Sequence, residues 1–190
     1  MKLACVVFAA CASAPPPAPP PPPAPWRLPA GWKDEVIPFP LEFAPQLAHR
    51  GVEELRFAPG FLDDKAAARW SYAFAWRLED PAVLDAPALE AELTAYFRGI
   101  LGAVDGDKHR LEPAQITVKV APDLAITAHL IDTFHDAAPV EVTGKARRIA
   151  CGGGAVWTFV LAPAESPVRS ELDALVREVT CGQPVHSSRR

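Results

Sequence analysis

The stretch WSYAFAWRLE, residues 70–79, decides the fold, because large side chains alternate in it with small or polar ones. A period of two is typical of a β-strand with one buried face. An aromatic row of this kind can bind a sugar or a peptide, but it is more often the core beneath a helix. We expect a core strand, whose buried face carries Trp70, Tyr72, Phe74, Trp76 and Leu78.

A helix is predicted directly after this strand. Asp85 is a suitable N-cap, and Pro87 falls in the first turn, where proline is tolerated. Gly99 and Gly102 weaken the end of the helix, and the turn DGDKH, residues 105–109, terminates it. The apolar positions recur at helical spacing and are Leu89, Leu93, Tyr96, Phe97, Ile100 and Val104.

Four further strands are predicted, over residues 116–120, 124–134, 140–150 and 155–162. The last is almost wholly apolar, as is typical of a central strand buried on both faces. CGGGA, residues 151–155, predicts a hairpin turn between the last two strands. A phosphate-binding loop is not indicated, because no Lys-Ser or Lys-Thr follows the glycines.

A second helix is predicted in SPVRSELDALVREVTCG, residues 166–182. Ser166 is expected to cap it, Pro167 to occupy its first position and Gly182 to stop it. The apolar positions of this helix are Val168, Leu172, Leu175, Val176 and Val179.

The segments EVIPFPLEF (35–43) and GVEELRFAPG (51–60) predict two edge strands, because prolines interrupt them. The order is then ββ(β)-α-ββββ-α, an α+β fold with a mainly antiparallel sheet and two packed helices, in one domain over residues 26–182. This layout resembles the PsbP/Mog1 type of sandwich. The resemblance concerns the fold and implies no function.

The N-terminus MKLACVVFAAC resembles the signal of a bacterial lipoprotein. One basic residue, Lys2, precedes a short apolar run, and the box Phe8-Ala9-Ala10 stands before Cys11. The resemblance implies that residues 1–10 are removed and that Cys11 is lipidated. Secretion with cleavage after Ala14 and a buried N-terminal strand are the alternatives.

Residues 15–25 hold nine prolines in eleven positions, which favours an extended polyproline II conformation. We therefore expect residues 11–25 to be a tether outside the fold, of about 30 Å at 3.1 Å per residue. A docking site for a proline-binding module is the alternative. Residues 183–190 are expected to form a disordered tail.

The cysteines agree with export. If Cys5 is removed with the signal and Cys11 is lipidated, Cys151 and Cys181 are left as an even pair. In an oxidising compartment such a pair forms a disulfide. The last turn of the second helix must unwind for Cys181 to reach Cys151.

Several classes of function are not supported. Basic and acidic residues, 19 and 23 of them, are mixed along the chain without a basic stripe, which argues against a nucleic-acid partner. No apolar run approaches the roughly 18 residues of a membrane-spanning helix. No Gly-x-Ser-x-Gly elbow, His-Glu-x-x-His or Cys-x-x-Cys motif occurs.

TAHLIDTFHD, residues 127–136, is the one concentrated set of reactive side chains. In a helix, His129, Asp132 and Asp136 would share a face and form a metal or acid–base cluster. In a strand, His129 and Asp132 point to opposite faces. Alternation and β-branched residues favour a strand that runs into a turn, so we expect no metal site and no cofactor.

The carboxylate of Asp132 must reach solvent or accept hydrogen bonds, because an unpaired buried charge is very costly. We expect backbone N–H groups or the side chain of Arg147 or Arg148 to bond to it. The adjacent acids Glu53-Glu54 and Asp63-Asp64 are expected to be solvated.

Two classes of function remain. The first is a lipid-anchored cell-envelope protein, attached through Cys11 to the outer membrane and facing the periplasm, with a non-catalytic binding or assembly role. Its partner would be an envelope protein or the cell wall. The alternative is a small envelope hydrolase or isomerase that uses His129 and Asp132.

Overall fold

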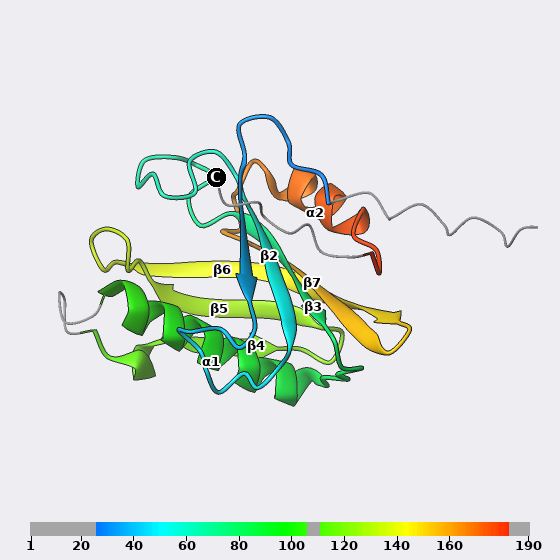
Figure 1. The fold of residues 1–190 in the computed structure, drawn as a ribbon. Coiled ribbons are helices and arrows are strands. Elements are labelled where there is room, and N and C mark those ends of the chain that lie inside the picture. The colour runs from blue at the N-terminus through cyan, green and yellow to red at the C-terminus, as the bar shows by residue number, and fades with distance from the viewer. Residues whose placement is uncertain (1–25, 106–110, 183–190) are drawn as a thin grey trace, which may run out of the picture.

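The computed structural model describes residues 26–105 and 111–182. Seven strands form one antiparallel sheet in the order β1-β2-β3-β7-β6-β5-β4 (Figure 1), and the sequence-based prediction of an α+β fold with two helices is confirmed. The strands are β1 (Lys33–Pro38), β2 (Gly51–Phe57), β3 (Tyr72–Leu78), β4 (Thr117–Val120), β5 (Ala125–Ile131), β6 (Pro139–Cys151) and β7 (Gly154–Ala162).

The two α-helices cover opposite faces of the sheet (Figure 1). Helix α1 (Ala86–Asp105) packs on one face and helix α2 (Arg169–Arg177) on the other, while a short 3-10 helix η1 (Pro113–Gln115) precedes β4. Two apolar cores result, one between α1 and the sheet and a smaller one between α2 and the sheet.

The aromatic row of β3 is core, as its alternation predicts. Phe74 is fully buried and stacks on Tyr96 of α1, with ring centroids 5.5 Å apart. The small side chains of the other face, Ala73 and Ala75, lie in the second core with Leu172 and Leu175 of α2. Both faces of this strand are therefore buried, and β7 beside it is buried in the same way.

Helix α1 begins where the sequence predicts. The Asp85 carboxylate accepts a hydrogen bond from the Ala88 N–H at 2.9 Å, which is an N-cap contact. The glycines do not end the helix, because it continues to Asp105. Gly99 has a packing role, because the backbone at Phe43 lies directly against the helix here. A Cβ atom at position 99 would lie 2.1 Å from the carbonyl oxygen of Phe43.

Three local predictions are wrong. Strand β2 is not an edge strand, because β1 pairs with it on one side and β3 on the other. The buried stripe of α1 passes through Leu101, whereas Ile100 and Val104 are only partly buried. Ser166 does not cap α2 and Pro167 is not its first residue, because the helix begins only at Arg169; the Ser166 hydroxyl bonds to that of Ser71 at 2.7 Å instead.

The predicted disulfide is present. Cys151 and Cys181 are bonded, with their Cα atoms 5.5 Å apart. Helix α2 ends at Arg177, so the chain has left the helix before it reaches Cys181, as this bond requires. Gly152 and Gly153 form the tip of the β6–β7 hairpin, in agreement with the predicted turn.

Other predictions fall outside the described residues. They concern the signal at residues 1–10, the tether at 11–25, most of the DGDKH turn and the tail at 183–190. Within residues 26–105 and 111–182, neither α-helix has the length and apolar character needed to cross a bilayer.

Candidate functional site

The stretch from Thr127 to Asp136 is a strand that runs into a turn, as predicted, with β5 ending at Ile131. The side chain of His129 is 57% exposed, and its Nδ1 atom lies 3.3 Å from a carboxylate oxygen of Glu141 on β6. Asp132 is fully buried. The structure therefore does not bring His129 and Asp132 together.

Asp132 organises the turn after β5. Its carboxylate accepts hydrogen bonds from the Phe134 N–H at 3.1 Å and from Nδ1 of His135 at 3.1 Å. The guanidinium of Arg69, in the loop before β3, lies 3.4 Å away. The bond to Asp132 raises the pKa of His135, because it favours the charged imidazolium.

The expected partners Arg147 and Arg148 are not the ones that bind Asp132. Arg147 donates to the backbone oxygen of Val176 in α2, whereas Arg148 donates to the carbonyl oxygen of Ala82 before α1. They are adjacent on β6 and so reach the elements packed on opposite faces of the sheet. The backbone part of the prediction, a bond from an N–H group to Asp132, is confirmed.

The pair Glu53-Glu54 is not solvated, and this prediction is wrong. Both residues lie on β2, with at most 1% of their surface exposed, and they point to opposite faces of the sheet. Glu54 accepts a hydrogen bond from Nε of Arg77 at 3.0 Å. Glu53 accepts one from the indole N–H of Trp76 at 3.1 Å on one oxygen, while its other oxygen has no hydrogen-bond partner among the described residues.

Burial is the main reason why the pKa of Glu53 is raised to about 8. The indole N–H of Trp76 and the nearby hydroxyl of Tyr96 favour the charged form and act in the opposite direction, and the negative charge of Glu35 adds to the increase. At neutral pH this carboxyl group is therefore mainly protonated.

A cavity of about 860 Å³ opens beside these residues, on the α1 face of β1, β2 and β3. Its volume lies in the range typical of sites for small molecules. Its walls are the C-terminal half of α1, the loop at residues 58–63 and the side chain of Phe134 from the turn after β5. Hereafter we refer to it as the aromatic cavity, because its lining includes Phe43, Phe57, Phe61, Trp70, Tyr72, Tyr96 and Phe134.

Five aromatic rings of this cavity, those of Phe57, Phe61, Trp70, Tyr72 and Phe134, contact one another in a continuous row, while Phe43 and Tyr96 form a separate pair. Phe61 is central: its ring centroid lies 4.7 Å from that of Phe57, 5.3 Å from Tyr72 and 5.9 Å from Trp70. Phe134 lies 5.4 Å from Trp70 and is 37% exposed, and Leu62, which also lines the cavity, is 50% exposed. Apolar surface is thus left open to solvent where the cavity meets the outside.

Trp70 holds an unusual backbone conformation in the cavity wall. Its φ angle is +56°, a left-handed value that is rare for a bulky residue. Its N–H donates to the Phe61 carbonyl oxygen at 3.2 Å, which fixes this conformation and ties the loop to the start of β3. Strained conformations of this kind concentrate at binding sites.

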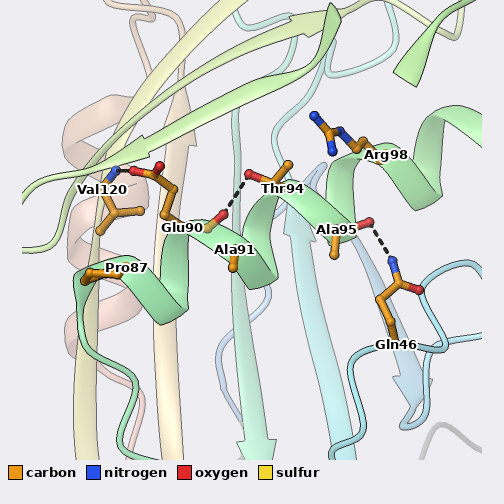
Figure 2. A pocket seen from close by; sticks show the side chains of 8 residues that line it. All are labelled: Gln46, Pro87, Glu90, Ala91, Thr94, Ala95, Arg98 and Val120. Atoms are coloured by element: carbon orange, nitrogen blue, oxygen red, sulfur yellow. Dashed lines mark hydrogen bonds between the residues drawn. The ribbon is translucent and has the colours of Figure 1, made fainter. Parts of the chain in front are cut away.

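A second hollow lies on the outer side of α1, where the helix meets β4 (Figure 2). Its polar side chains are occupied by the protein itself: Glu90 accepts the Val120 N–H, Thr94 donates to the carbonyl oxygen of Glu90, and Gln46 donates to that of Ala95. No hydrogen-bonding group among these three side chains is aimed at a ligand, so we regard the aromatic cavity as the candidate site.

The described residues offer little for catalysis. Asp132 and His135 form a carboxylate–imidazole pair of the type that general-base catalysis uses. Ser71 and Ser166 bond to each other, however, and Ser170 lies on α2, on the face of the sheet opposite the cavity. Within the described ranges, no group of three or more His, Cys, Asp or Glu side chains is placed to hold a metal ion.

Sequence reasoning missed the cavity, although it identified part of its wall. Trp70 and Tyr72 belong to the aromatic row quoted above, and they line the cavity whereas Phe74 and Trp76 are fully buried below α1. Phe57 and Phe134 were predicted to lie in strands, and Phe134 instead lies in the turn after β5; nothing in their spacing or in that of Phe61 indicates that the three rings meet.

Comparison of the chain with protein-family models, with curated proteins and with solved structures finds no match. The resemblance to the PsbP/Mog1 sandwich therefore stays a prediction from the order of the elements alone.

Proposed function

We propose that this chain is a lipid-anchored protein of the cell envelope that binds an apolar small molecule in the aromatic cavity and performs no chemistry on it. The observation that carries the proposal is the cavity itself, with its continuous row of aromatic rings. Large aromatic side chains bury much apolar ligand surface and lose little conformational freedom when they bind.

The arrangement of reactive groups supports binding rather than catalysis. The cavity lining contains no histidine, cysteine or serine among the described residues. The Asp132–His135 pair lies next to Phe134 in the chain, but the carboxylate is already engaged by the Phe134 N–H and by Arg69. These bonds serve to hold the turn that carries Phe134.

The location rests on the signal-like N-terminus and on the disulfide. A lipid on Cys11 and a proline-rich segment behind it would keep the domain near a membrane surface. The Cys151–Cys181 bond is expected in an oxidising compartment outside the cytosol.

Ligand binding is tested with decan-1-ol as the probe, by isothermal titration calorimetry and tryptophan fluorescence on the purified protein. We expect saturable binding. Ala103 lines the cavity from α1 and is exposed, so Ala103→Phe should fill the opening and weaken binding at least fivefold. Ala91→Phe is the matched control, because it places the same ring on the outer groove of the same helix. Equal binding by both variants, or none by the unchanged protein, would contradict the site.

Anchoring is tested by fractionating cells that express the full chain. We expect the protein in the membrane fraction, and we expect Cys11→Ala to release it into the soluble fraction. Cys5→Ala is the control, because in the proposed lipoprotein Cys5 lies in the signal that is removed and carries no lipid. A Cys11→Ala protein that stays on the membrane would overturn the lipid anchor.

A further inference from the structure

The charges at the mouth of the aromatic cavity are unbalanced. Four charged side chains line it: Asp34, Glu35 and Asp63 are acidic, and Lys33 is basic. All four are exposed. Among the described residues none of the four forms a salt bridge within 4.0 Å. The single positive charge of Lys33 can offset the charge of one of the three carboxylates at most.

The strand register shows which of these charges face the cavity. Glu35 stands opposite Leu55, a cavity residue, and so shares its face of the sheet. Asp34 stands opposite Arg56, on the other face of the strand from Glu35, and its negative charge favours the charged form of that arginine. Glu35 and Asp63 remain to act on a bound molecule, and of these the Asp63 carboxylate also accepts the Lys65 N–H at 3.0 Å on one oxygen, which leaves its negative charge in place.

The wall behind the mouth is also unfavourable for an anion. Aromatic rings carry partial negative charge on their faces, which attracts cations. Glu53, buried beside Tyr96 in this part of the core, is mainly protonated at neutral pH and supplies no positive charge that could bind an anion. The lining has no arginine and no histidine among the described residues that could pair with a phosphate or carboxylate.

We infer that the aromatic cavity binds a small organic cation, an amine or quaternary ammonium group that carries an apolar chain or ring. The apolar part lies against the row of rings that includes Phe57, Phe61 and Trp70. The cationic group lies at the mouth, near Glu35 and Asp63 and over the aromatic faces. This inference rests on the proposed function and adds the charge of the ligand.

The test compares three probes with the same tail: decyltrimethylammonium and decanoate below their micelle concentrations, and decan-1-ol below its solubility limit. We expect the cation to bind on the order of fivefold more tightly than the alcohol, as a cation–aromatic contact beside a carboxylate gives. Decanoate should bind more weakly than the alcohol. The preference for the cation should shrink in 0.5 M salt, because the mouth is exposed.

Glu35→Gln isolates the electrostatic part. It should weaken binding of decyltrimethylammonium several-fold and leave binding of decan-1-ol unchanged. Glu165→Gln removes an exposed acid from the loop before α2, on the other side of the sheet, and should change neither. This control shows whether the general negative charge of the protein is responsible.

The outcomes separate the inference from the proposed function. If the alcohol binds and the cation binds no better, or if decanoate binds best, the cation inference is wrong while the apolar site stands. If Glu35→Gln and Glu165→Gln weaken cation binding equally, the preference for a cation comes from the overall charge of the protein and not from Glu35 at the mouth of the cavity. If none of the three probes binds, the proposed function and the inference both fail.

Discussion

The Nε atom of Arg69 lies 3.4 Å from the Oδ2 atom of Asp132 and joins the loop before β3 to the turn after β5. Asp132 is fully buried, so this contact and the bonds from Phe134 and His135 together compensate one carboxylate. The two segments it joins carry Trp70 and Phe134 of the aromatic cavity. The shape of the cavity wall therefore depends on a carboxylate that does not line it.

Replacing Asp132 with alanine should lower the free energy of unfolding by about 1–3 kcal/mol, because buried donors lose their acceptor. The measurement is urea unfolding followed by circular dichroism. Asp136→Ala is the control: this neighbour is exposed and accepts the Ala138 N–H, with no other hydrogen bond from the described part of the chain, so the loss should be smaller. Equal losses in the two variants would contradict a structural role for the buried carboxylate.

Glu53 should make stability depend on pH. Its pKa is raised from 4.5 in the unfolded chain to about 8 in the folded protein, so between these values the folded state holds a proton that the unfolded state has lost. The contribution of the raised Glu53 pKa to the free energy of unfolding is therefore fully present below about pH 4.5 and is lost as the pH rises towards 8. The slope should reach roughly 1.4 kcal/mol per pH unit at most.

Glu53→Gln should remove the part of the pH dependence that comes from Glu53, because a neutral amide replaces the protonated acid. Glu42→Gln, at an exposed acid, should keep it. A weaker slope of the same sign is expected to persist, because the pKa values of His49 and His135 are also raised. Unfolding curves between pH 5 and 8 that coincide for the unchanged protein would refute the neutral carboxyl group.

Two glycines of α1 should respond to alanine with opposite signs. Gly99→Ala places a methyl group against the Phe43 carbonyl and should destabilise the protein by about 1–3 kcal/mol. Nothing lies within 4 Å of a Cβ at Gly102, so Gly102→Ala should stabilise it by about 0.5–1 kcal/mol through helix propensity. Thermal unfolding of both variants gives the comparison. A stabilising Gly99→Ala would show that the segment at Phe43 does not lie over the helix.

Reducing the Cys151–Cys181 bond should lower stability by about 3–4 kcal/mol, the chain-entropy estimate for a loop of 30 residues. Unfolding in urea with and without reductant measures this. The Cys151→Ser/Cys181→Ser double variant should match the reduced protein and show no effect of reductant. If reductant destabilises the double variant as well, the bond is not the cause.

The order of strands and helices could be predicted from the sequence, because each element carries a periodic pattern. Residues 72–78 alternate, and residues 86–105 repeat at helical spacing. The burial of Glu53 and Glu54 could not be predicted, because it depends on pairing with both β1 and β3. Nothing local shows that β2 has a neighbour on each side, or that Trp76 and Arg77 supply the hydrogen bonds.

The partner of Asp132 was missed for a related reason. Arg147 and Arg148 follow Asp132 closely in the chain, but β6 turns their side chains towards helix α2 and the loop before α1. Arg69 lies far from Asp132 in sequence and in a loop without a pattern. The cavity likewise combines β1, β2, α1 and two loops, so its existence depends on tertiary packing rather than on any single segment.

Helix α1 is fastened along the β4 edge by Glu90, which accepts the Val120 N–H and the Lys119 ammonium, and by Arg98, which donates to the Ile116 carbonyl oxygen. The cavity thus has one wall held by side-chain bonds to the sheet edge and a softer rim at Leu62, whose side chain is 50% exposed and has little packing to displace when it moves. The residence time of a bound molecule should accordingly be set by that rim. Changes at Leu62 should alter the dissociation rate, whereas a change at the exposed Glu165, on the other side of the sheet, should leave it unaltered.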